Sequence, residues 1–302
     1  MCSKAFSWLA CCLLTTEVMT MTSISTHSTR RGMISASSAT LLIQGAFSIP
    51  NEALAENKNS VVVDDLFSRL EVSTIAPKVP QFQLTSSDLI YPDFLQGLWD
   101  VRSRTRSIDA PCGVALFGGE GLLKKATEEI DNSELDLVYS CRFVRGEGGK
   151  LVADRAYNIK TIASASMGSV SVLDLSATPN EVKCTLQPSN AGGVLFKVDI
   201  LALGRKQQYD EASGVYVFDE VGRNVVETVV GGERKSVGLK EVETISTYKL
   251  VGEGKVEGRQ KSLTYLVPSP DPSTMEFKMW AATGGKPIDV RTYDVTYTKR
   301  VT

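Results

Sequence analysis

Side chains able to do acid–base or metal chemistry are scarce in this chain. Its one histidine, His27, lies within the first 55 residues, which have the composition of a presequence that is removed. A mature chain without histidine cannot use a histidine general base, a Ser–His or Cys–His pair, or a His-ligated zinc or haem. We therefore predict no catalytic residue, no metal site and no required cofactor.

Cysteine chemistry is limited as well. Half of the cysteines lie in the first 55 residues, which leaves Cys112, Cys141 and Cys184 without any C-x-x-C spacing. This odd number permits one disulfide with one free thiol, and three buried thiols are an equally good interpretation.

Arg155 is the one charged residue that the pattern places inside the fold. The region reads as a strand, and the residues on its apolar face are Leu151, Ala153, Arg155, Tyr157 and Ile159. A guanidinium facing a barrel interior needs a carboxylate, which Asp136, Asp199 or Asp294 would provide. The alternative is a contact with an anionic ligand. Both interpretations remain open.

Aromatic side chains recur on the apolar faces of the predicted strands. They are Tyr139, Phe143, Tyr157, Phe196, Tyr265, Phe277, Tyr293 and Tyr297. Such a stripe fills a barrel as core, or it lines a pocket for a flat apolar ligand. On the second interpretation, the candidate ligand-binding residues are Arg155, Tyr157, Phe196, Tyr265, Tyr293 and Tyr297.

Charge and glycine patterns argue against two classes of function. The chain has 33 basic and 35 acidic residues and a net charge of −2, so it lacks the basic excess of a nucleic-acid binder. The glycines of Gly113–Gly121 and of Gly252-x-Gly254 do not form a phosphate-loop motif. We expect these glycines to lie in turns.

Alternation of apolar and polar residues predicts antiparallel strands from residue 94 onward. Examples are Leu137 to Phe143, Val194 to Ile200, Met275 to Met279 and Tyr293 to Tyr297. Only residues 122–130 look helical inside this region, and residues 61–70 predict a short amphipathic helix before it. Roughly nine or ten strands without a proline-rich break favour a mainly β fold, one closed antiparallel barrel. The expected divisions are residues 1–55, a helix and linker over 56–90, and the barrel over 91–302.

The first 55 residues resemble several targeting signals in series. A short apolar run from Ala5 to Leu14 suits a signal peptide, and residues 18–31 are hydroxyl-rich and free of acidic groups. Arg30-Arg31 then precedes a mildly apolar stretch and Ala53-x-Ala55, the pattern of a twin-arginine signal. We predict cleavage after Ala55 and residence in a plastid thylakoid lumen. A single bacterial twin-arginine peptide is the alternative. No later apolar run approaches the roughly 20 residues that a membrane helix needs.

The first predicted barrel strand carries a G-x-W motif, Gly97-x-Trp99. In lipocalins this glycine permits a close turn and the tryptophan fills the closed end of the barrel. Their last strand pairs with the first and brings a basic residue over the tryptophan. Lys299 and Arg300 are the candidates, and strand parity puts Lys299 on the face of Tyr297 and Arg300 on the other face.

Longer segments resemble an uncharacterised lipocalin- or calycin-like domain family of cyanobacteria and plastid-bearing eukaryotes. These are Tyr91-Pro92-Asp93-Phe94-Leu95-x-Gly97-x-Trp99-Asp100-Val101, Val152-Ala153-Asp154-Arg155-Ala156-Tyr157-Asn158, Ser246-x-Tyr248 and Tyr293-Asp294-Val295-x-Tyr297-Thr298-Lys299-Arg300. The resemblance covers residues 88–300 and implies a calycin-type fold and a lumenal or plastid location. It implies no activity.

Three functions therefore remain open. The first is a lumenal carrier of a hydrophobic molecule such as a carotenoid, a tetrapyrrole or a lipid. The second is an auxiliary protein in photosystem assembly or repair, with a filled barrel and photosystem subunits as partners. The third, which we favour least, is a lumenal enzyme that uses Asp and Tyr as acid and base on an isoprenoid.

Overall fold

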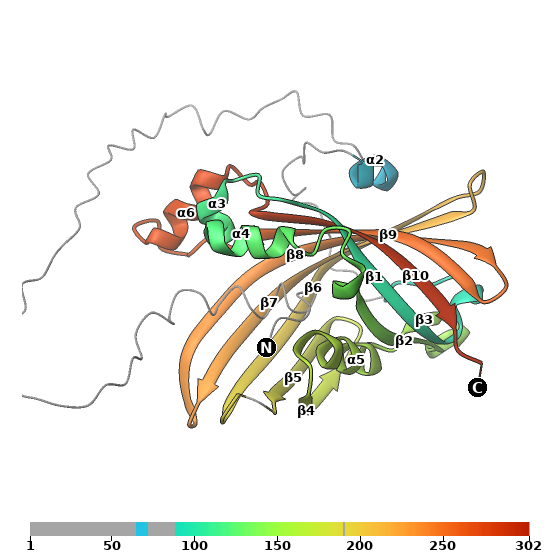
Figure 1. The fold of residues 1–302 in the computed structure, drawn as a ribbon, viewed down its shortest axis with the longest axis horizontal. Coiled ribbons are helices and arrows are strands. Elements are labelled where there is room, and N and C mark those ends of the chain that lie inside the picture. Colours follow the sequence, from blue (N-terminus) through green and yellow to red (C-terminus); the bar gives the residue numbers. More distant parts are fainter. Residues whose placement is uncertain (1–64, 72–87, 190, 302) are drawn as a thin grey trace, which may run out of the picture.

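A single antiparallel sheet of ten strands curls into a half-barrel in the computed structural model of the chain (Figure 1). The structure describes residues 65–71, 88–189 and 191–301. The strands are β1 (Gly97–Asp109), β2 (Leu137–Arg145), β3 (Leu151–Ala153), β4 (Val170–Ala177), β5 (Glu181–Pro188), β6 (Val194–Asp210), β7 (Val215–Val230), β8 (Glu233–Gly252), β9 (Lys255–Leu266) and β10 (Asp289–Lys299). The antiparallel, mainly β prediction is confirmed.

The barrel is open, which corrects the prediction of a closed one. The spatial order is β3-β2-β1-β10-β9-β8-β7-β6-β5-β4, so β3 and β4 end the sheet without pairing to each other. The helix α5 (Arg155–Met167) lies beside β2, β4 and β5 at the opening (Figure 1). Because β3 has three residues and α5 follows at once, a helix instead of another strand covers the open side.

The described residues contain five α-helices, more than the sequence predicts. They are α2 (Leu66–Glu71), α3 (Val114–Phe117), α4 (Glu120–Thr127), α5 (Arg155–Met167) and α6 (Met275–Thr283). Short 3-10 turns lie at Asp93–Leu95, Ser133–Leu135 and Glu147–Gly149. The predicted helix at 122–130 corresponds to α4, and α2 covers the described end of the predicted 61–70 helix. The predicted strands through Arg155 and through Met275 are wrong, since both stretches are helical.

Capping explains the two helices that the alternation missed. Asp154 precedes α5, and its side chain accepts a hydrogen bond from the backbone N–H of Tyr157 at 3.0 Å. Thr274 caps α6 in the same way through Phe277 N–H at 3.3 Å. Each capping side chain satisfies an N–H that has no partner within the first turn of the helix, and so favours a helix over a strand.

The first and last strands pair, as the sequence predicts. Trp99 lies opposite Lys299 in the β1–β10 register. Trp99 is fully buried and donates from Nε1 to the Leu95 carbonyl at 2.7 Å. Gly97 has a φ of 111°, a backbone conformation that residues with a Cβ rarely adopt, which accounts for glycine at this turn into β1.

Apolar side chains cover both faces of the sheet. On the inner face, one core surrounds Trp99 and Tyr293, and a second joins α5 to β4, β5 and β6 around Ala163. On the outer face, Leu66 of α2 packs against residues of β7, β8, β9 and β10, including Val217 and Ile245. Since both faces are covered, alternation along a strand does not reveal which face is the inside.

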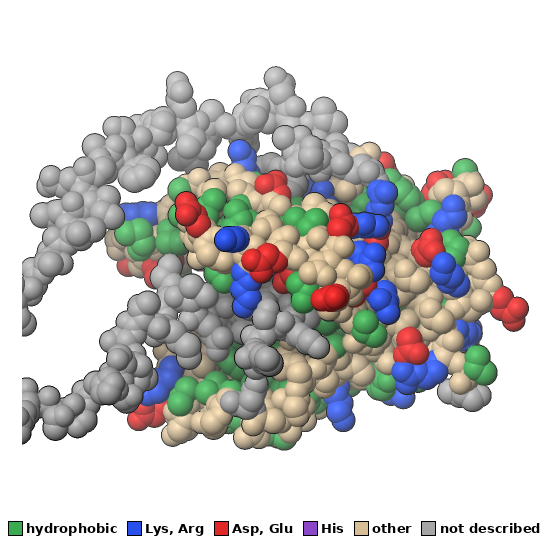
Figure 2. Space-filling model, viewed as in Figure 1, with side chains coloured by type: hydrophobic (Ala, Val, Ile, Leu, Met, Phe, Trp, Pro, Cys, Tyr) green, Lys and Arg blue, Asp and Glu red, His purple; other side chains and the backbone are tan. Residues whose placement is uncertain are grey.

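Acidic and basic side chains lie next to one another on the face shown in Figure 2, not in separate patches. Ion pairs along β1 illustrate this mixing, such as Arg104 with Asp136 at 2.8 Å and Arg106 with Asp294 at 2.6 Å. None of the described helices has the length and apolar character needed to cross a membrane.

Candidate functional site

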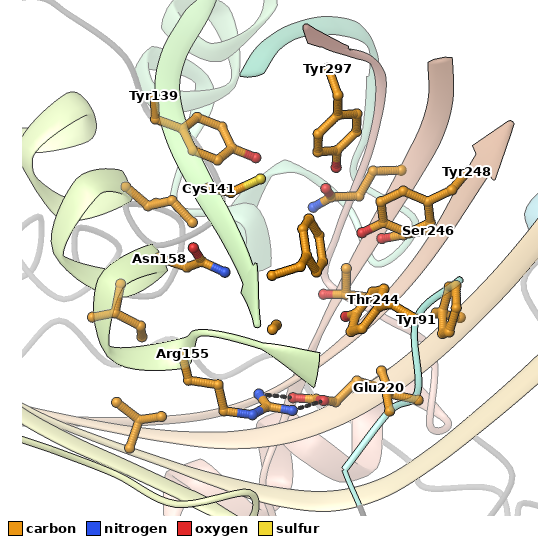
Figure 3. A pocket seen from close by; sticks show the side chains of 18 of the residues that line it. Tyr91, Tyr139, Cys141, Arg155, Asn158, Glu220, Thr244, Ser246, Tyr248 and Tyr297 are labelled. Carbon is orange, nitrogen blue, oxygen red and sulfur yellow. Dashed lines mark hydrogen bonds and ion pairs between the residues drawn. The ribbon is translucent and has the colours of Figure 1, made fainter. Parts of the chain in front are cut away.

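A cavity of about 180 Å³ lies on the inner face of the sheet, between α5 and the strands β2, β7, β8 and β10. Its apolar wall comes from side chains such as Phe143, Ile159, Ile162 and Phe218. Hydroxyls line one end and an ion pair lines the other (Figure 3). The remaining polar residues of the lining are Asn158, Thr244 and Gln260.

The hydroxyl end is formed by Tyr139, Ser246, Tyr248 and Tyr297 (Figure 3). Burial raises the pKa of Tyr139 and of Tyr297 well above the usual value and raises the pKa of Tyr248 to about 12. These phenols are therefore neutral at physiological pH and offer O–H donors to the cavity. Cys141 lies beside them, and burial raises the pKa of its thiol as well.

Arg155 lies at the opposite end, as the first residue of α5. Its Nη2 is 2.6 Å from Asp88 Oδ1 and 2.8 Å from Glu220 Oε2. A second guanidinium, that of Arg205, contacts the same Glu220 oxygen at 2.9 Å. Two arginines thus face two carboxylates, which leaves no net charge for an anionic ligand.

The pKa shifts agree with this pairing. Burial alone would lower the pKa of Arg155, but the charge of Glu220 and hydrogen bonds to Glu220 and Asp88 raise it above the usual value. Burial alone would raise the pKa of Glu220, but Arg155 and Arg205 hold it below the usual range. The ion-pair interpretation of Arg155 therefore fits the structure, although Arg155 also lines the cavity.

The expected partners of Arg155 are engaged elsewhere. Asp136 pairs with Arg104, Asp294 pairs with Arg106, and Asp199 lies 3.8 Å from Lys183. The error follows from the strand prediction, because a helical Arg155 points to different neighbours.

Of the predicted ligand-binding residues, Arg155 and Tyr297 line the cavity and four others do not. Tyr157 lies under Arg142, whose guanidinium carbon is 4.5 Å from the centroid of the Tyr157 ring. Phe196 packs in the core beneath α5, and Tyr293 packs in the core around Trp99. Tyr265 lies on the outer face, where its hydroxyl donates to Glu243 Oε2 at 2.9 Å.

Of the predicted structural residues, Lys299 takes the place expected of the basic residue. Its Nζ lies 5.6 Å from the Trp99 ring centroid. Arg300 is on the other face and binds Asp100, with Nε 3.2 Å from Oδ2. Both positions follow from strand parity.

Sequence reasoning missed Tyr91, Tyr248 and Glu220 as cavity residues. Tyr91 stacks on Phe218 with ring centroids 4.7 Å apart. Tyr91 and Tyr248 do occur in the segments that carry the family resemblance, which would have been a usable signal. Glu220 has no such signal, because an isolated acidic residue in a strand resembles a solvent-facing one.

A second buried polar cluster lies on the outer face beneath α2. Arg69 Nε donates to Glu243 Oε1 at 3.0 Å, and Lys261 donates to the Arg69 carbonyl at 3.0 Å. Asp219 is fully buried nearby, with neither carboxylate oxygen hydrogen bonded to a described residue. Burial and the charge of Glu243 raise the pKa of Asp219 well above the usual value, which Arg69 and Lys206 only partly oppose.

The remaining cysteines are free thiols, of which Cys141 and Cys184 are buried. This agrees with the interpretation as thiols and not with a disulfide among them, except that Cys112 is only partly buried. Among the described residues, no cluster of His, Cys, Asp and Glu side chains is suited to hold a metal ion.

Of the comparisons with known proteins, only the one with protein families gives a match. No curated protein and no solved structure matches the chain. Residues 83–301, which include every described strand and the whole cavity lining, match a family described as a domain of unknown function, DUF6816. The chain belongs to this DUF6816 family.

Proposed function

We propose that the chain binds one uncharged, mainly apolar small molecule in the inner cavity. The observation that carries this proposal is the lining: aromatic and aliphatic walls with a few neutral hydroxyls at one end. Ligand pockets typically combine such walls with a small number of placed polar groups. The balanced pairing of Arg155 and Arg205 with Asp88 and Glu220 supports an uncharged ligand over an acidic one.

The size of the cavity narrows the choice of ligand. Its volume of about 180 Å³ is below the range of about 300–1,000 Å³ typical of pockets for drug-sized molecules. A carotenoid, a tetrapyrrole or a lipid would therefore place only one end inside. A pigment or lipid remains a suitable ligand if its ring or its terminus enters the cavity.

A thylakoid lumen is the proposed location. The support is the series of targeting features in residues 1–55, above all Arg30-Arg31 and Ala53-x-Ala55. These residues lie outside the part of the chain that the structure describes.

Organic extraction of the protein purified from its native cells tests the binding proposal. Mass spectrometry of the extract should find one dominant uncharged compound, close to one molecule per chain. Ala153→Leu adds bulk at the cavity wall and should remove most of this compound. Val138→Leu is the control, because it adds bulk at an exposed position on β2, away from the cavity. An empty extract, or equal amounts from both variants, would contradict binding in the cavity.

An auxiliary role in photosystem assembly or repair is the second candidate. Its support is that much of the inner face is packed solid, with Trp99, Phe143 and Tyr293 all buried. Co-purification of photosystem subunits with a ligand-free chain would favour this role. The enzyme alternative has less support, since the Glu220 carboxylate is held by two guanidiniums and is a poor proton acceptor.

A further inference from the structure

The hydroxyls at one end of the cavity differ in how they are used. Tyr248 and Tyr297 lie side by side, with ring centroids 5.4 Å apart. A hydrogen bond between their two hydroxyls contributes to the pKa of each phenol. Tyr139 faces them from β2 (Figure 3). Its hydroxyl forms no hydrogen bond with any other residue that the structure describes.

From this geometry we infer that the ligand presents a carbonyl oxygen on a single uncharged ring to Tyr139 and its neighbours. The inference rests on the proposed function and names the chemical class of the molecule bound there. A carbonyl oxygen has two lone pairs and no donor, so it can accept hydrogen bonds from two phenols at once. A purely apolar ligand would displace water from the Tyr139 O–H without offering an acceptor, which is costly.

The rest of the lining fits a ring in this orientation. Ile159 and Phe218 provide apolar contacts, and Tyr91 stacks on Phe218 at the edge of the cavity. Two amides also line the cavity, those of Gln260 and Asn158, and the Asn158 amide is already engaged with the backbone of Arg142. It donates to the Arg142 carbonyl at 3.2 Å and accepts from Arg142 N–H at 2.7 Å.

The volume of the cavity also suits one ring. An apolar protein cavity of about 150 Å³ is large enough to bind benzene. The volume of about 180 Å³ found here leaves room for one ring with a small substituent.

Three probes of nearly the same shape test the inference: acetophenone, 1-phenylethanol and isopropylbenzene. They carry a carbonyl, a hydroxyl and a methyl group at the same position, and none reacts with the Cys141 thiol. Their dissociation constants would be measured by NMR titration of the full-length chain. Acetophenone should bind about fivefold more tightly than isopropylbenzene, the usual effect of one neutral hydrogen bond.

Tyr139→Phe provides the decisive comparison. It should lower the affinity for acetophenone about fivefold and should not lower the affinity for isopropylbenzene, which makes no hydrogen bond to Tyr139. Tyr209→Phe is the matched control, because Tyr209 is exposed on β6 and away from the cavity lining. A thermal melt of each variant confirms that it is folded.

The outcomes separate this inference from the proposed function. If isopropylbenzene binds as tightly as acetophenone, or if 1-phenylethanol binds most tightly, the carbonyl inference is wrong while an apolar site remains. The same holds if Tyr139→Phe leaves acetophenone binding unchanged. If none of the three probes binds in the cavity, the proposed function itself fails.

Discussion

Lys299 and Trp99 face each other across the β1–β10 pair, with the ammonium nitrogen 5.6 Å from the ring centroid. The contact joins the first strand along the chain to the last one, and these two strands are neighbours in the sheet. Trp99 is fully buried, and its indole N–H is bonded to the Leu95 carbonyl. The start of β1 is therefore anchored in the core that surrounds Trp99.

Trp99→Ala should lower the free energy of unfolding by about 3–5 kcal/mol, because it removes the largest fully buried side chain and leaves a cavity. Denaturant unfolding measures the loss. Trp280→Ala in α6 is the control, since Trp280 is only partly buried, and a smaller loss is expected there. A Trp99→Ala loss below about 1 kcal/mol would show that Trp99 is not central to the core around it.

The relation between Trp99 and Lys299 could be predicted from the sequence, since it depends only on a short motif and strand parity. The openness of the barrel could not be predicted, because it depends on α5, whose first residues continue the alternation of β3 through Arg155, Tyr157 and Ile159. The capping residue Asp154 was the local signal that the strand ends there. A helix and a strand often share short apolar patterns, and only the cap separates them.

The candidate site was predicted less completely than the fold. Arg155 and Tyr297 were identified, but Tyr265 was assigned to the wrong face. The alternation of side chains along a strand fixes which residues share a face. It does not tell which face is the inner one here, because α2 makes the outer face apolar as well. Glu220 and Asp88 were missed because their pairing with Arg155 brings together distant segments.

Arg155→Met should destabilise the fold by about 3–5 kcal/mol, because it leaves Asp88 without its partner and weakens the pairing of Glu220. Thermal and denaturant unfolding give the loss, and Asp88→Asn in the same chain should restore part of it. Arg106→Met, whose partners Asp131 and Asp294 are exposed, should cost about 1 kcal/mol or less. Full stability of Arg155→Met with loss of the extracted ligand would instead make Arg155 a ligand contact.

Asp219 should make stability fall as pH rises. Burial raises the pKa of Asp219 in the folded chain, whereas the unfolded chain releases this proton near its ordinary pKa of about 3.9. The folded state thus binds more protons, and stability is lost as pH rises from that value through the folded pKa. Asp219→Asn cannot ionise, so its melting temperature should exceed that of the wild type at pH 8 and match it near pH 4.

Asp136→Asn is the control of opposite sign. Hydrogen bonds from Arg104 lower the pKa of Asp136, so its contribution to stability is present at neutral pH and lost in acid. This variant should therefore melt lower than the wild type at pH 8. An Asp219→Asn variant that also melts lower at pH 8 would refute the role assigned to the buried carboxyl.

The mature protein should begin at Glu56, directly after Ala53-x-Ala55. N-terminal sequencing of the protein from fractionated plastids measures this. Replacing both arginines, Arg30→Lys with Arg31→Lys, should block processing, because the twin-arginine route requires the pair. A mature form that retains Arg30-Arg31, or one found outside the lumen, would rule out the proposed location.

Binding of an uncharged apolar molecule in the inner cavity is the central claim, and NMR of the nine tyrosines tests it most directly. The full-length chain, labelled with 13C in its tyrosine rings, would be titrated with toluene. The signals of Tyr91, Tyr139, Tyr248 and Tyr297 should shift and saturate with a dissociation constant below about 1 mM, while those of exposed Tyr209 and outer-face Tyr265 stay in place. Unchanged signals from the four cavity tyrosines, or shifts equally large at Tyr209, would contradict the claim.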